Sequence, residues 1–249
     1  GDTGAEASHV VVVLAMPEEP VEPPELPEVA HLEEWMASPH ADATAEAFTH
    51  WDEDGEIPTS CARCHSSTGY ADYLGADGTA PGSVEAAAPL GTVVGCTACH
   101  SDAANSLSEV TFPSDVTVTD LGPSARCMVC HQGRSSTASV DSAIADSTAG
   151  DADAVDAELG FINIHYYPAA ATLYAGKARG GYQYEGEVYD YRFRHVEGVD
   201  SCVGCHDAHT TQVKFNTCTA CHDGVTDAET ARDIRMIASM NQDYDGDGD

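Results

Sequence analysis

The cysteines of this chain occur in pairs separated by two residues, and a histidine follows every pair at once. The stretch TSCARCHSSTGY shows the pattern with Cys61, Cys64 and His65. A disulfide needs no adjacent histidine, and a zinc site usually takes its histidine from further along the chain. Covalent haem attachment does need one, because the two thiols add across the porphyrin vinyl groups and the imidazole then lies beneath the iron as its proximal ligand.

Five such motifs use all ten cysteines, and we number them 1 to 5 in chain order. Histidine makes up only 12 of 249 residues, so a histidine after every pair would arise by chance on the order of once in a few million. Zinc clusters would combine the pairs in twos, which an odd number of pairs cannot do cleanly. The sequence therefore predicts five haem c groups. The attachment cysteines are Cys61 and Cys64, Cys96 and Cys99, Cys127 and Cys130, Cys202 and Cys205, and Cys218 and Cys221, and the proximal iron ligands are His65, His100, His131, His206 and His222.

Seven histidines lie outside the motifs, enough to give every one of the five irons a second axial ligand. Two histidines per iron favour lower reduction potentials than a histidine and a methionine, and they leave no coordination position for a substrate. This supply favours electron transfer over catalysis. The best candidates for distal ligands are His40, His50, His165, His195 and His209, and the reserves are His31 and then His9, which could ligate a haem of a neighbouring subunit.

Spacing along the chain ranks some of these candidates. His206 and His209 would lie one helical turn apart on the same face of a helix, so His209 should ligate a different haem from that of motif 4. His195 lies seven residues before motif 4, and His50 lies eleven residues before motif 1. Both are near enough to cap a neighbouring haem.

The charge of the chain is strongly acidic, with a formal net charge of −32 at pH 7. Lys177 and Lys214 are the only lysines, so binding to nucleic acid or to an anionic membrane surface is disfavoured. Such acidity keeps a protein soluble, but self-repulsion opposes the compact state unless salt screens it. An extracellular protein that needs solubility and a protein of a salty habitat both fit.

The supply of large apolar side chains is small, with 5 Phe and 2 Trp in 249 residues. Five porphyrins would replace much of the core that such side chains normally form. We therefore expect a mostly irregular, loop-rich fold with short α-helices and a few short β-hairpins, organised around a chain of five haems.

Local patterns place the elements of this fold. The N-terminal segment contains an apolar strand over 8–16 and a stiff, acidic polyproline arm over 17–27. Domain boundaries follow, with residues 1–27 as a possible inter-subunit contact and 28–249 as the pentahaem domain. Further expected elements are helices over 28–37, 42–51 and from a capping box at 226–229 to about 240, a loop over 66–95, a strand or hairpin over 107–121, two short helices over 135–159 and a hairpin over 182–193 with its turn at Glu185 and Gly186.

The two ends of the chain carry their own predictions. The chain begins at Gly1 without a basic segment, as expected after removal of a signal peptide, and its apolar run over 10–16 is too short to span a bilayer. Because c-type haem is attached outside the cytoplasmic membrane, we expect export to the cell surface or beyond, with the periplasm as the alternative. At the other end, Asp243, Asp245 and Asp247 match the first half of a Ca²⁺ loop, although a plain acidic tail fits as well.

The five motifs resemble those of multihaem c-type cytochromes. The stretches NIHYYPAAATLYAGKARGGYQYEG and CHDAHTTQVKFNTCTACH look like those of exported multihaem cytochromes, some of which polymerise into extracellular filaments known as nanowires. The resemblance covers most of residues 28–240. It implies a continuous chain of haems, and it implies that a histidine of one subunit can ligate a haem of the next.

Three functions compete. The first is one-electron relay from haem to haem, as a homopolymer that delivers electrons to a redox partner or an acceptor outside the cell, or as a monomeric periplasmic carrier. The second is a multihaem oxidoreductase of the nitrite or hydroxylamine type. Pentahaem nitrite reductases replace the motif histidine by lysine at the catalytic haem, whereas all five motifs here end in histidine. The third is haem storage or a scaffold. The sequence favours the first.

Overall fold

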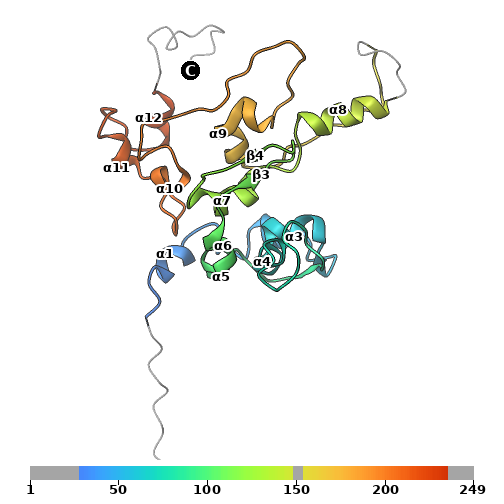
Figure 1. The fold of residues 1–249 in the computed structure, drawn as a ribbon. Helices are drawn as coiled ribbons and strands as arrows, with labels where there is room; N and C mark the ends of the chain where they lie inside the picture. The colour runs from blue at the N-terminus through green and yellow to red at the C-terminus, as the bar shows by residue number, and fades with distance from the viewer. Residues whose placement is uncertain (1–27, 148–153, 235–249) are drawn as a thin grey trace, which may run out of the picture. The chain divides into compact units, whose positions relative to one another are not determined.

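The structure is a computed structural model that describes residues 28–147 and 154–234 (Figure 1). Its elements are short, and the longest described helices have ten residues. The expected fold class, irregular chain with short helices and short antiparallel strands, is confirmed. The helices are α1 (Leu32–Met36), α2 (Glu46–Thr49), α3 (Thr59–His65), α4 (Ser67–Tyr73), α5 (Cys96–His100), α6 (Asp102–Ser106), α7 (Ser124–His131), α8 (Thr137–Asp146), α9 (Ala169–Ala178), α10 (Cys202–Cys205), α11 (Phe215–Cys218) and α12 (Ala228–Arg232).

The described strands form two small antiparallel pairs. β1 (Glu56–Ile57) pairs with β2 (Ala88–Pro89), and β3 (Val110–Thr111) pairs with β4 (Thr117–Val118). The β3–β4 pair is the hairpin expected over 107–121, and the facing hydroxyls of Thr111 and Thr117 hydrogen bond at 2.9 Å. Neither pair is large enough to be stable alone, so both depend on packing against the helices.

The main apolar cluster lies around α7 and α9, which contact each other and which contact or lie beside β3 and β4 (Figure 1). Phe112 and Met128 are almost fully buried there, and the ring of Tyr174 packs against Phe112 with 5.9 Å between centroids. Alanines fill much of the remaining cluster. The core is small, as expected from the shortage of large apolar side chains.

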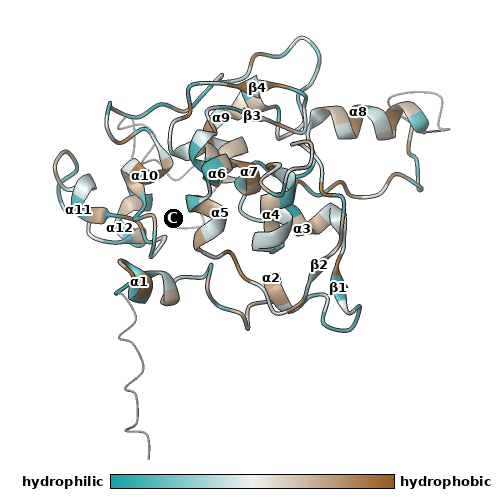
Figure 2. Cartoon of the chain, turned by 60° about the horizontal axis from the view of Figure 1, so that its bottom comes forward, coloured by the Kyte–Doolittle hydropathy of each residue, from teal (hydrophilic) through white to brown (hydrophobic). Residues whose placement is uncertain are grey.

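Apolar residues are distributed over many short helices in Figure 2, and they do not collect into one long stripe. Across residues 28–147 and 154–234, none of the helices combines the length and the apolar character required to cross a membrane.

Four of the expectations for local structure need correction in extent. The helices expected over 28–37 and 42–51 are present as α1 and α2 but are shorter. The expected loop over 66–95 begins with α4, because the Ser66 hydroxyl accepts a hydrogen bond from Gly69 N and caps the helix. Of the two helices expected over 135–159, α8 is present, and the described residues 154–159 form no helix.

The hairpin expected over 182–193 is wrong, although the turn at Glu185 and Gly186 is present. The second arm bonds to α9 instead of to the first arm. Gly176 N donates to Asp190 O, and Phe193 N donates to Leu173 O. A break in α9 at Ala175, with φ 36° and ψ −121°, frees these backbone groups for the contact.

The capping box that opens α12 is shifted by one residue from the expected one. Asp227 accepts from Thr230 N at 2.9 Å, and the Thr230 hydroxyl bonds back to Asp227 N at 3.1 Å. The helix is described to Arg232. The N-terminal strand and arm, and therefore the domain boundary at residue 27, lie outside the described residues and stay predictions.

Candidate haem-binding sites

The five motifs lie on short helices or helical turns, which set the side chains as attachment requires. Motifs 1, 2 and 3 end α3, α5 and α7, motif 4 forms α10 with His206 as its C-cap, and motif 5 follows from the end of α11 as a turn in which His222 N donates to Cys218 O. Residues three and four apart on a helical turn share one face, so each motif presents both thiols and the imidazole together. All ten cysteines are free, and none is fully buried.

Backbone carbonyls orient three of the motif imidazoles. The Nδ1 atoms lie 2.7 Å from Ala47 O for His65, 3.0 Å from Tyr167 O for His131, and 2.9 Å from Thr211 O for His206. Because a carbonyl can only accept, Nδ1 must carry the proton, and Nε2 is then left as the metal ligand. No sequence pattern indicates these acceptors, because any residue can supply a carbonyl.

Four motif histidines face a second histidine at the separation that an iron would require. With metal–nitrogen bonds of about 2.0 Å on each side, two imidazole centres must lie roughly 6 Å apart. The residues present therefore fit a haem iron held by two histidines. The pairs are His131 with His40 at 6.3 Å, His65 with His165 at 5.9 Å, His100 with His209 at 6.1 Å, and His222 with His195 at 6.2 Å between ring centroids.

Proteins similar to this chain are named as cytochromes with several c-type haems. The C-type polyheme cytochrome OmcB of Geobacter sulfurreducens is 28% identical over 263 residues, which cover 80% of this chain and 34% of the relative, and OmcC of the same species is 27% identical over 277 residues, which cover 85% and 34%. Over at least four fifths of its length, the chain is therefore similar to multihaem c-type cytochromes. It spans about a third of the length of these relatives. No protein-family model matches the chain, and no solved structure matches it significantly.

Of the five preferred distal candidates, His50 alone does not lie about 6 Å from a motif histidine in the described residues. Its Nδ1 lies 2.9 Å from a Glu46 carboxylate oxygen, and its ring contacts Trp51 edge-on at 4.9 Å. Within the two described ranges, His206 of motif 4 likewise has no histidine ring near the 6 Å separation. For all five motifs, the assignment of two histidines as axial ligands of a haem iron is therefore a proposal.

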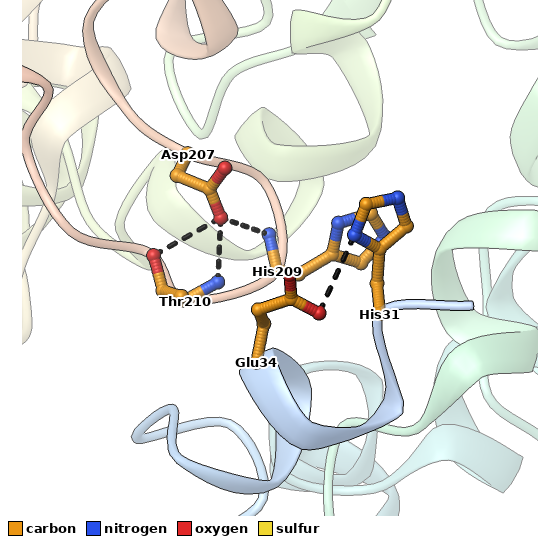
Figure 3. A network of polar contacts seen from close by, with 5 residues as sticks. All are labelled: His31, Glu34, Asp207, His209 and Thr210. Carbon is orange, nitrogen blue, oxygen red and sulfur yellow. Dashed lines mark hydrogen bonds and ion pairs between the residues drawn. The ribbon is translucent and has the colours of Figure 1, made fainter. Parts of the chain in front are cut away.

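His31 stacks on His209 and does not face it across a metal (Figure 3). The two rings lie 4.3 Å apart with 4° between their planes, which is too close for an iron between them. A carboxylate oxygen of Glu34 lies 3.4 Å from His31 Nδ1. The stack therefore packs one face of the His209 ring.

The loop that carries His209 is not the helix that its spacing predicts, so that premise is wrong. The carboxylate of Asp207 accepts from His209 N at 3.1 Å, from Thr210 N at 2.8 Å and from the Thr210 hydroxyl at 3.0 Å (Figure 3). A turn closed by Asp207, and not a helix, therefore carries His209. The prediction that His209 serves another haem than motif 4 stays a prediction, and its 6.1 Å separation from His100 supports it.

Burial favours the neutral, ligand-competent form of two distal candidates. Burial, and then the nearby His131, lower the pKa of His40. Burial, and then Arg134 and His65, lower the pKa of His165, whose Nδ1 is buried without a hydrogen-bond partner. His165 also has a positive φ of 91°, a conformation that costs about 1–3 kcal/mol and that clusters at functional sites.

Cysteines of different motifs influence each other's pKa. The hydrogen bond with Cys130 lowers the pKa of Cys64 to about 6 and raises that of Cys130, and the hydrogen bond with Cys127 lowers the pKa of Cys202 to about 6 and raises that of Cys127. The cysteines of motif 3 therefore influence the pKa of one cysteine in motif 1 and of one in motif 4.

The calcium prediction at Asp243, Asp245 and Asp247 lies outside the described residues of the chain. In the described part, the carboxylates of Asp72 and Glu85 come within 4.8 Å of that of Asp77. This group is largely exposed and belongs to a different segment from the predicted one.

Proposed function

We propose that this chain transfers electrons through five covalently bound haem c groups, each held by two histidines. The observation that carries the proposal is the set of four imidazole pairs at 5.9 to 6.3 Å. Bound haem iron supplies reversible one-electron chemistry. The chain holds both axial positions with imidazoles, so water and small substrates find no open position.

The source of the fifth distal ligand decides whether the protein is a monomeric carrier or a polymer. Motif 4 faces no described histidine at the required separation, and His31 and His50 are engaged elsewhere in the described ranges. His9 follows as the ligand of the motif 4 iron. The apolar strand over 8–16 can add to the edge of a neighbouring subunit, and the proline arm is stiff enough to project it. His9 of one copy would then ligate motif 4 of the next.

This arrangement makes the protein a homopolymeric electron conduit outside the cell, with a redox partner or an extracellular acceptor at its end. Its acidity disfavours nucleic acid as a partner. A monomeric periplasmic carrier is the alternative if His9 ligates its own chain. An oxidoreductase is the alternative if the motif 4 iron stays open.

The experiment begins with mass spectrometry and an optical spectrum of the exported protein. We expect the mass of the chain plus five haems, low-spin spectra throughout and no binding of carbon monoxide to the reduced native protein. Fewer than five haems would contradict the haem count. A high-spin band in the native protein would favour the oxidoreductase.

Variants of the N-terminal segment then separate polymer from monomer. Deletion of residues 1–16 should abolish filaments in electron micrographs, and added salt should favour the parent's assembly by screening its charge. His9→Ala should open one iron to carbon monoxide, whereas His31→Ala, the matched control, should open none. A parent that stays monomeric at every salt concentration would rule out the polymer. Filaments that survive the deletion would rule out the N-terminal segment as the contact between subunits.

A further inference from the structure

Helix α7, which carries motif 3, packs against α3, the helix of motif 1, and hydrogen bonds to it. The thiol of Cys130 contacts the carbonyl of Arg63 at 3.7 Å, and Arg63 immediately precedes Cys64. The side chain of Cys130 is also the largest cause of the lowered pKa of Cys64, which agrees with this contact. Packing of α3 against α7 thus brings the second cysteine of motif 1 onto the second cysteine of motif 3.

The same helix is bonded to motif 4. Cys202 N donates to the hydroxyl of Ser124 at 3.1 Å, and Ser124 is the first residue of α7. Helix α10 contacts α7, and Cys127 is the largest cause of the lowered pKa of Cys202. The hydrogen bond from Cys202 therefore places the start of motif 4 beside the N-terminal end of α7.

Motif 2 reaches α7 through an arginine. The guanidinium of Arg126 donates to Cys99 O at 2.6 Å, and Arg126 O accepts from the Tyr70 hydroxyl at 2.8 Å. Burial, and then charges on Cys130, Cys99 and Cys127, raise the pKa of Tyr70, so this phenol lies close to sulfurs of both motifs. Tyr70 is buried in the main apolar cluster, which fixes the contact.

Motif 5 is fastened to motif 4 and not to α7. Lys214 N donates to Cys205 O at 2.8 Å, and its ammonium group donates to Val203 O at 2.6 Å. Lys214 directly precedes α11, which leads into motif 5. In the part of the chain that the structure describes, none of the hydrogen bonds joins motif 5 to α7.

We propose that the haem of motif 3 is a branch point with three haem neighbours, those of motifs 1, 2 and 4, and that the haem of motif 5 has one neighbour, that of motif 4. Attachment adds each S–H across a vinyl double bond, with sulfur on one carbon and hydrogen on the other, so no oxidant is needed. Because the cysteines of each motif become part of a porphyrin edge, motif segments that contact each other place these edges side by side. The proposal rests on the proposed function, since it requires haem at each motif.

The test marks one haem by its potential and observes which others respond. Methionine in place of an axial histidine raises the reduction potential, so in His131→Met the motif 3 haem is reduced first and becomes diamagnetic. Electron paramagnetic resonance during a redox titration then shows which of the still oxidised haems lose magnetic coupling. We expect three signals to change. In His222→Met, the matched control for motif 5, we expect one.

A second measurement uses the native protein and covers the case in which His131→Met does not fold. Proton NMR of the fully reduced holoprotein should show cross-relaxation between thioether protons of motifs 1 and 3 and between those of motifs 3 and 4. No such signal should join motifs 3 and 5. Missing contacts to motif 1 or 4, or one to motif 5, would overturn the branch point.

Failure of the branch point is distinguishable from failure of the proposed function. Five haems and low-spin spectra, with only one or two signals responding in His131→Met, would overturn the branch point alone. Absence of haem from Cys127 and Cys130 in the mass spectrum of tryptic peptides would overturn both.

Discussion

Single imidazoles can be exchanged in this protein without disturbing the attachment helices, because the four distal candidates that face a motif lie on turns or irregular chain. His165 is the clearest example. His165→Met should raise the reduction potential of one haem, that of motif 1, since the thioether is a weaker donor to Fe(III). Redox titration followed by optical spectroscopy measures the shift.

The control for this variant is His50→Met, because His50 lies near the same motif but pairs with Glu46. We expect its titration curve to match that of the parent. If the reduction potential shifts in His50→Met and not in His165→Met, His50 is the distal ligand of the motif 1 haem and His165 is not.

The stacked pair His31 and His209 allows a sharper test of ligand against neighbour. His209→Ala should leave one haem five-coordinate, and carbon monoxide should bind it after reduction. His31→Ala removes only the stack and the contact with Glu34, so all haems should stay low-spin. If His31→Ala opens the iron and His209→Ala does not, His31 is the ligand.

At the scale of elements, helix α4 packs tightly against α3 at Gly69. A Cβ atom added at Gly69 would lie 2.6 Å from the Cβ of Ala62 and still closer to the Ala62 carbonyl oxygen. Ala62 is fully buried, so the helices must separate. Gly69→Ala should therefore destabilise the protein by about 1–3 kcal/mol, seen as a lower Tm by circular dichroism.

Gly160→Ala is the matched control, because a Cβ there meets no atom within 4 Å. Its Tm should equal that of the parent. Equal Tm values for both variants would show that α3 and α4 separate at no cost.

Elements with a local cause could be predicted from the sequence, and those with a distant cause could not. The β3–β4 hairpin follows from alternation within 107–121, and α12 follows from its own cap. The prediction of a hairpin over 182–193 is wrong because the second arm hydrogen bonds to α9 at its break. No residue near that arm indicates the break. The helix expected at 206–209 fails because the carboxylate of Asp207 binds the backbone in its place.

The candidate site divides in the same way. The attachment cysteines and motif histidines follow from spacing alone, and four of the five preferred distal histidines face a motif at the separation of two iron ligands. Which distal histidine faces which motif depends on contacts between segments far apart in the chain. His100 and His209, for example, are separated by 109 positions, counted as 209 minus 100.

At the scale of the whole molecule, charge dominates. The formal charge is −32, and haem propionates add to it, so like-charge repulsion opposes the folded state. The Debye length falls from about 30 Å at 0.01 M salt to about 3 Å at 1 M. The Tm should therefore rise with added NaCl, as calorimetry of the holoprotein can measure.

KCl at the same ionic strengths is the control, because screening depends on concentration and not on the cation. Equal rises in both salts support screening. A Tm that does not change with salt would mean that the bound haems, and not charge repulsion, determine the stability of the folded protein.

The short loop over 165–167 serves two motifs at once. His165 faces His65 of motif 1, and two residues later Tyr167 O accepts the hydrogen bond from His131 of motif 3. Both loop residues have positive φ, 91° and 52°, so the loop has little freedom to adjust one end alone. With haem bound as proposed, this loop would join the distal ligand of the motif 1 iron to the group that sets the basicity of the motif 3 ligand. We therefore expect one substitution in the loop to change the reduction potentials of both haems, which a redox titration can measure.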